Sequence, residues 1–114
     1  MNALIIDDNM IARTTIRHLA GKSGNIDIVA ECADATSAYE LLQSRPVDLL
    51  LLDIEMPGMS GLELTQHLGE KRPVIIFITS KREYAADAFD LNVADYIIKP
   101  VTTSRFIRAI EKAR

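Results

Sequence analysis

The run Leu49-Leu50-Leu51-Leu52 contains four apolar residues and no polar one. A second run of the same kind, Val74-Ile75-Ile76-Phe77-Ile78, follows later in the chain. A strand that exposes one face to water alternates apolar and polar residues, so unbroken apolar runs indicate strands that are covered on both faces. The two runs are therefore typical of a parallel β-sheet packed between two layers of helices.

The rest of the chain repeats an alternation of strand and helix. Short apolar runs predict five strands, at residues 3–6, 26–32, 47–52, 74–78 and 96–98. Apolar residues spaced three and four apart predict an amphipathic helix after each strand. An eight-stranded barrel typically takes about 250 residues. Because the chain has only 114, we predict an open, doubly wound (βα)5 sandwich of the α/β class.

The fourth of these helices is expected at residues 83–91. Ser80 and Glu83 have the spacing of a capping box, which predicts that the helix begins there. Its apolar face consists mostly of alanines, and Phe89 is the only large residue on that face. A helix packed this weakly can change position at small cost, so we expect it to be the mobile element.

Composition predicts a single domain over residues 1–114, since 114 residues with 48% apolar content supply one core. The net charge of −3 and the lack of a basic stripe argue against direct nucleic-acid binding. No apolar stretch reaches the roughly 18 residues that a membrane span needs, and no signal-peptide pattern opens the chain. The single cysteine, Cys32, cannot form an internal disulfide, which favours a cytoplasmic location.

Polar residues directly follow four of the five apolar runs, namely Asp7-Asp8, Asp53, Thr79 and Lys99-Pro100. The carboxyl ends of parallel strands meet at one edge of the sheet, where ligands of doubly wound folds bind. We therefore expect these side chains to converge. Each alone has a plainer explanation: Asp8 could cap a helix, and Thr79 could be an ordinary strand residue.

Three carboxylates in one cleft raise one another's pKa unless a cation compensates for their charge. Lys99 supplies only one positive charge, which indicates that a metal ion supplies the rest. Oxygen ligands without histidine or cysteine favour a hard divalent cation, and an open cleft with few protein ligands favours Mg²⁺. A carboxylate beside such a site can act as a nucleophile toward a phosphoryl group.

These motifs resemble the receiver domains of two-component response regulators. The resemblance rests on Leu4-Ile5-Ile6-Asp7-Asp8, on residues 51–61 (LLDIEMPGMSG), on Ile78-Thr79-Ser80 and on residues 95–100 (DYIIKP). It covers essentially the whole chain, in order and with matching spacings. It implies one receiver domain over residues 1–114, with the flavodoxin-like strand order 2-1-3-4-5.

The resemblance also implies a role for each site residue. Asp53 would be the phospho-acceptor. Mg²⁺ would be bound by Asp8, Asp53 and the Glu55 backbone carbonyl, and by Asp7 through water. Lys99 and Thr79 would bind the phosphoryl group, Thr79 and Tyr96 would form the switch, the Lys99–Pro100 peptide would be cis, and Glu55 and Lys81 would tune the rate of dephosphorylation.

The partner implied by the family is a sensor histidine kinase, and the domain would be a signalling domain that assists its own phosphorylation rather than an enzyme. Its readout would use the face formed by the fourth helix, fifth strand and fifth helix, which also offers a homodimer contact. Residues 84–89 (YAADAF) with Asp95-Tyr96 are similar to receivers of the LytR/AlgR type, which carry a C-terminal DNA-binding domain outside this chain.

Three other interpretations remain open at this stage. A flavodoxin-like cofactor binder shares the fold class, but Asp7-Asp8-Asn9 would repel an anionic cofactor in the absence of a metal. A phosphatase with Asp53 as its nucleophile would need a cap domain, for which the chain has no room. A receiver-shaped interaction module that is never phosphorylated would have the fold but no use for the complete set of site residues.

Overall fold

The computed structural model describes all 114 residues of the chain, Met1–Arg114. The chain forms five strands: β1 (Asn2–Ile6), β2 (Asp27–Cys32), β3 (Leu49–Leu52), β4 (Val74–Thr79) and β5 (Asp95–Ile98). Five helices alternate with them: α1 (Met10–Ser23), α2 (Ala35–Leu42), α3 (Gly61–Leu68), α4 (Ala85–Asp90) and α5 (Thr103–Ala113). The predicted alternation of strand and helix is confirmed.

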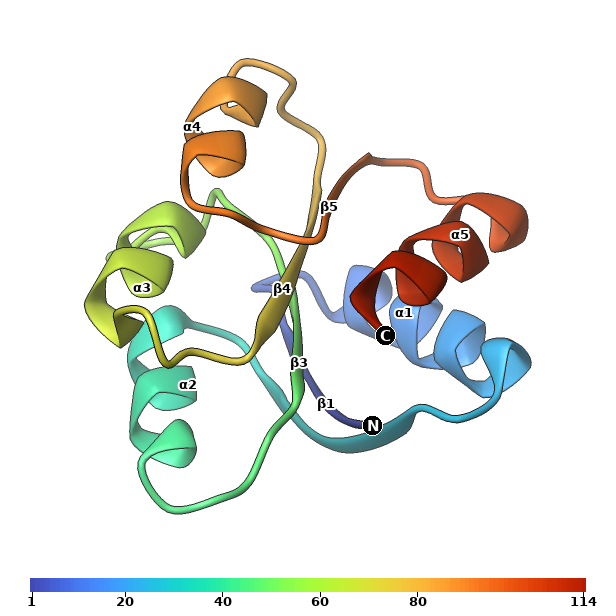
Figure 1. Ribbon diagram of the computed structural model, residues 1–114, viewed down its shortest axis with the longest axis horizontal. Helices are drawn as coiled ribbons and strands as arrows, with labels where there is room; N and C mark the ends of the chain where they lie inside the picture. The colour runs from blue at the N-terminus through green and yellow to red at the C-terminus, as the bar shows by residue number, and fades with distance from the viewer.

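The strands form one sheet in the order β2-β1-β3-β4-β5, and every neighbouring pair is parallel. Helices α1 and α5 cover one face of this sheet, and α2, α3 and α4 cover the other (Figure 1). The predicted doubly wound sandwich and its strand order are therefore confirmed. The order reverses between β1 and β3, and ligand sites of such folds lie beyond the carboxyl ends of the strands at this point.

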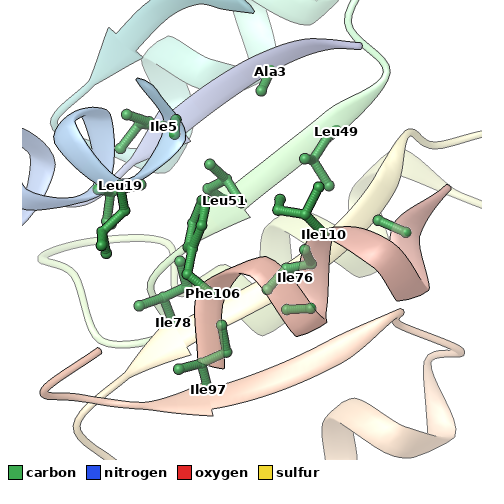
Figure 2. Packing of buried hydrophobic residues seen from close by; sticks show 14 residues of the cluster. Ala3, Ile5, Leu19, Leu49, Leu51, Ile76, Ile78, Ile97, Phe106 and Ile110 are labelled. Atoms are coloured by element: carbon green, nitrogen blue, oxygen red, sulfur yellow. The ribbon is translucent and has the colours of Figure 1, made fainter. Parts of the chain in front are cut away.

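The β3 strand is the centre of the core, because its four leucines are fully buried. Alternate side chains of a strand point to opposite faces, so Leu49 and Leu51 pack on one side of the sheet and the other two on the opposite side. Figure 2 shows Leu49 and Leu51 in the cluster that includes Phe106 of α5 and Leu19 of α1. The unbroken leucine run is thus covered on both faces, as its sequence predicts.

The fourth helix differs from the expectation. The α4 helix begins only at Ala85, and Tyr84 stands at its N-cap without a side-chain hydrogen bond, so the predicted capping box of Ser80 and Glu83 is wrong. Phe89 is 82% exposed, whereas Ala88 is fully buried. In a six-residue helix one narrow stripe faces the sheet, and Ala88 occupies that stripe. Phe89, one position further around the helix, therefore points into solvent.

An ion pair fastens the edge strand β5 to α5. The Arg105 guanidinium donates to both carboxylate oxygens of Asp95, at 2.6 and 2.8 Å, and to the backbone carbonyl of Tyr96 at 3.1 Å. Burial acts to raise the pKa of the Asp95 carboxyl, but hydrogen bonds from Arg105 and from the Tyr96 N–H outweigh it, and this pKa lies below its ordinary value. Folding therefore favours the ionised form of Asp95.

We expect Asp95→Asn to lower the free energy of unfolding by about 2 kcal/mol at pH 7, because charge-assisted hydrogen bonds to Arg105 are lost. The depressed pKa sets the pH dependence. The stabilisation is complete above the unfolded pKa of about 4 and disappears as pH falls through the lower folded value. Urea unfolding of both proteins at pH 7 and pH 3 measures this; a stability gap that stays constant with pH would contradict it.

Candidate functional site

The sheet brings the predicted site residues to one edge. Asp7, Asp53 and Lys99 directly follow β1, β3 and β5, and Thr79 is the last residue of β4. Backbone hydrogen bonds join these ends: the Asp53 N–H donates to Ile6 at 2.9 Å, and the Lys99 N–H donates to Thr79 at 2.9 Å. The convergence expected from the polar residues at the strand ends is therefore present in the structure.

Three carboxylates meet beside one ammonium group at this edge. Asp7, Asp8 and Asp53 each offer an oxygen, and these oxygens lie within 4.8 Å of one another. The Lys99 Nζ lies 2.9 Å from Asp7 Oδ2 and 3.4 Å from Asp53 Oδ2. Asp7 and Asp53 are buried, whereas Asp8 is exposed. Two of the three carboxylates are thus buried, and Asp8 is the one that solvent reaches.

Burial is the main influence on the pKa of the Asp53 carboxyl and raises it, and the charge of Asp7 raises it further. The Lys99 ammonium and hydrogen bonds from Thr79 and Ile54 act in the opposite direction, but this pKa stays above its ordinary value. Burial also disfavours the charged form of Lys99, yet its carboxylate partners raise the Lys99 pKa overall. One ammonium does not balance three carboxylates, so the cleft favours additional positive charge.

The chemistry of the donors fits a hard divalent cation. Every side chain of the cluster offers oxygen, and neither histidine nor cysteine belongs to it. Asp7 accepts hydrogen bonds on both carboxylate oxygens, from the Asn9 N–H and from Lys99, each at 2.9 Å. Asp53 accepts the Ile54 N–H and Lys99 in the same way, whereas Asp8 accepts no hydrogen bond within the chain. Each carboxylate oxygen has a second lone pair, so all three residues can still contribute ligands. Such an oxygen set, open to water on one side, suits Mg²⁺ better than a closed Ca²⁺ cage.

Beside the carboxylates, Lys81 connects the remaining predicted residues. Its N–H donates to Thr79 Oγ1 at 3.3 Å, and its carbonyl accepts the hydroxyl of Tyr96. Its ammonium lies 3.5 Å from Glu55 Oε1, with both side chains about half exposed. The Tyr96 ring packs on Phe77 with centroids 6.1 Å apart. The Thr79 and Tyr96 side chains thus contact the same short segment between β4 and α4.

Two contacts at this edge were not anticipated from the sequence. The Arg13 guanidinium donates to the Asp7 backbone carbonyl at 2.7 Å, and the Asn9 N–H holds the Asp7 side chain. Arg13 lies in the first turn of α1, six residues after Asp7 in the sequence, so its long side chain can reach back to the Asp7 carbonyl. No sequence motif distinguished it from an ordinary surface arginine. The Lys99–Pro100 peptide, by contrast, is cis, as the resemblance to receiver domains implied.

Residues 3–111 match the family model described as the response regulator receiver domain. The chain belongs to this family. A transcriptional regulatory protein of Salmonella typhi, BtsR, is 39% identical over 115 aligned residues, which cover 100% of this chain and 48% of that protein. BtsR of Escherichia coli K12 is 36% identical with the same coverage. The receiver chain thus spans about half the length of the curated relatives it matches.

Solved structures agree with this assignment. The response regulatory domain of the mrkE protein of Klebsiella pneumoniae is 33% identical, with a TM-score of 0.92 over 99% of this chain and 94% of that one. The response regulator TrrA of Thermotoga maritima, solved in complex with Mg²⁺ and beryllium fluoride, is 27% identical, with a TM-score of 0.85 over 99% and 98% of the two chains. The protein is therefore a signalling domain of the response-regulator type.

Membership of the receiver family argues against two of the three alternatives that the residues left open. It identifies this domain neither as a flavodoxin-like cofactor binder nor as a capped phosphatase.

Cys32 is a buried free thiol at the end of β2, in keeping with a packing role. None of the helices has the length and apolar character that crossing a membrane requires.

Proposed function

We propose that this receiver domain takes a phosphoryl group onto Asp53 from the phosphohistidine of a sensor histidine kinase, with Mg²⁺ as its cofactor. The proposed unit is a single receiver domain over residues 1–114, acting in the cytoplasm without binding nucleic acid or membranes itself. The supporting observation is the cluster of Asp7, Asp8 and Asp53 within 4.8 Å of one another, with Lys99 between two of them.

In the proposed step an oxygen of Asp53 attacks phosphorus, the P–O bond forms, and the P–N bond to the donor imidazole breaks. The nitrogen leaves with the electron pair and takes up a proton. Asp53 Oδ1 already accepts the Ile54 N–H at 2.8 Å, whereas Oδ2 faces Lys99. The phosphoryl group would therefore form on Oδ2, where Lys99 and Thr79 bind its oxygens.

The residues that would hold the metal are Asp8, Asp53 and the Glu55 backbone carbonyl directly, with Asp7 acting through water. The indirect role of Asp7 is the one that the receiver family implies, and its carboxylate is already paired with Lys99 at 2.9 Å. Mg²⁺, when bound, supplies positive charge against the phosphoryl oxygens. Glu55 and Lys81 border the approach to Asp53 through their ion pair, and we propose that they tune the rate of dephosphorylation.

The proposed readout couples Thr79 and Tyr96 to the face formed by α4, β5 and α5. Both switch side chains contact Lys81, so recruitment of the Thr79 hydroxyl by a phosphoryl group would disturb the segment that Tyr96 also holds. Phe89, which is part of α4, is exposed. A homodimer contact there, and a C-terminal DNA-binding output domain of the LytR/AlgR type, are the partners we propose, since matching relatives are transcriptional regulators about twice as long.

Phosphorus NMR with acetyl phosphate tests this function. We expect an acid-labile acyl-phosphate resonance from the protein when Mg²⁺ is present, and its disappearance when the metal is removed with EDTA. The metal dependence follows because one ammonium leaves the carboxylate cluster with surplus negative charge that repels an incoming phosphoryl group. Absence of this resonance in the presence of Mg²⁺ would contradict the proposal. It would favour the remaining alternative, a receiver-shaped interaction module that is never phosphorylated.

A further inference from the structure

Asp7 is held by hydrogen bonds to both its backbone and its side chain. Its N–H donates to the Cys32 carbonyl at 3.0 Å, and its carbonyl accepts the Arg13 guanidinium at 2.7 Å. Its two carboxylate oxygens accept Asn9 and Lys99, both at 2.9 Å. Every polar group of Asp7 therefore has a partner within the chain, which matches its exposure of only 1%.

Asp8 stands in contrast to Asp7. It is exposed and forms no ion pair within the chain. The position of its carboxylate therefore depends on the backbone that carries it. The Asp7 carbonyl and the Asp8 N–H belong to one planar peptide unit, so a group that fixes this carbonyl also fixes the position of the Asp8 Cα, from which the side chain leaves the backbone.

Arg13 is itself held in place on its other side. Its Nε lies 3.5 Å from Glu31 Oε1, and the other oxygen of Glu31 pairs with Arg17. The Arg13 and Glu31 side chains are only 18% and 24% exposed. The planar guanidinium presents several donors in a fixed arrangement, so one arginine can bridge a carboxylate and a carbonyl at once. Arg13 thus connects β2 to the turn that carries Asp7 and Asp8.

We propose that Arg13 is a positioning residue for the metal site. It holds the Asp7–Asp8 peptide so that the Asp8 carboxylate stands near Asp53 before a cation arrives, and Glu31 acts through it. Groups that orient metal ligands in this way typically change metal affinity by about 10- to 100-fold when removed. This inference rests on the proposed function, because it takes Mg²⁺ to be the ion that the cluster binds.

The charge of Arg13 and its hydrogen bond should have opposite effects on the affinity for Mg²⁺. A guanidinium near three carboxylates competes electrostatically with a cation, so removing its charge alone would tighten Mg²⁺ binding. Removing the hydrogen bond to Asp7 loosens the turn. Mg²⁺ binding must then offset the entropy cost of ordering Asp8, so the affinity for Mg²⁺ falls. The sign of the change therefore separates positioning from simple electrostatics.

The test is a calorimetric Mg²⁺ titration of the wild-type chain, Arg13→Ala and Arg17→Ala. Arg17→Ala is the matched control, since it removes the same charge from the same helix and also breaks a pair with Glu31, but it does not touch Asp7. We expect the dissociation constant to rise about tenfold for Arg13→Ala and to stay within about twofold for Arg17→Ala. Unchanged or tighter binding by Arg13→Ala would overturn the proposal.

A second measurement needs no metal. Amide NMR of the metal-free proteins should show faster hydrogen exchange at Asn9, whose N–H donates to Asp7 Oδ1, in Arg13→Ala than in the wild type or Arg17→Ala, with spectra otherwise alike. Equal exchange at this amide in all three proteins would contradict the positioning role. A wild-type chain that binds no Mg²⁺ would refute the proposed function instead, while the exchange measurement would still report on Arg13.

Discussion

Asp53→Asn is expected to abolish phosphoryl uptake from acetyl phosphate in the presence of Mg²⁺. The amide cannot act as the attacking oxygen nucleophile and offers one ligand oxygen in place of two. Intact-protein mass spectrometry and phosphorus NMR both measure the outcome, and the expected signal is zero.

We do not expect the loss to arise from unfolding, because the substitution should stabilise the fold. The pKa of Asp53 is raised above its ordinary value, chiefly by burial. The ionised carboxylate therefore costs stability at neutral pH, and asparagine removes that cost. Asp27→Asn, at the exposed start of β2, is the matched control and should be phosphorylated like the wild type. Full uptake by Asp53→Asn would place the phosphoryl group on another residue.

Gly61→Ala is expected to have the largest effect on stability. A Cβ at Gly61 would lie 2.2 Å from the backbone oxygen of Asp53, and the next nearest atoms, at 3.1 Å, are also backbone. The Gly61 N–H also donates to Ile54 at 2.8 Å, so helix and loop cannot separate without breaking that bond. Overpacking against atoms that cannot move aside costs up to about 3 kcal/mol, and it would displace Asp53 as well.

Gly21→Ala is the natural control for this variant. Gly21 lies inside α1, and no atom lies within 4 Å of the Cβ that the substitution would add. Alanine is favoured over glycine in a helix by about 0.5 to 1 kcal/mol, so this change should stabilise the chain. Urea unfolding of the two variants should therefore give changes of opposite sign. A Gly61→Ala protein as stable as the wild type would show that the β3–α3 loop can relax.

Several features of the molecule followed directly from the order of residues. The apolar runs identified the strands, and the two unbroken ones required cover on both faces, as the burial of Leu49–Leu52 shows. The polar residues at the ends of four strands could be assigned to one edge because parallel strands all point the same way. These inferences succeed because they rest on periodicity and on the direction of the chain, both of which are local properties.

Tertiary structure alone decided the rest. Whether Phe89 packs or faces solvent depends on how much of the sheet lies beneath α4, and a helical pattern cannot show that. The contact between Arg13 and the Asp7 carbonyl depends on the angle between α1 and β1 and on Glu31 from β2. Contacts made by long side chains across elements are set by packing geometry, whereas burial of a strand is set by composition.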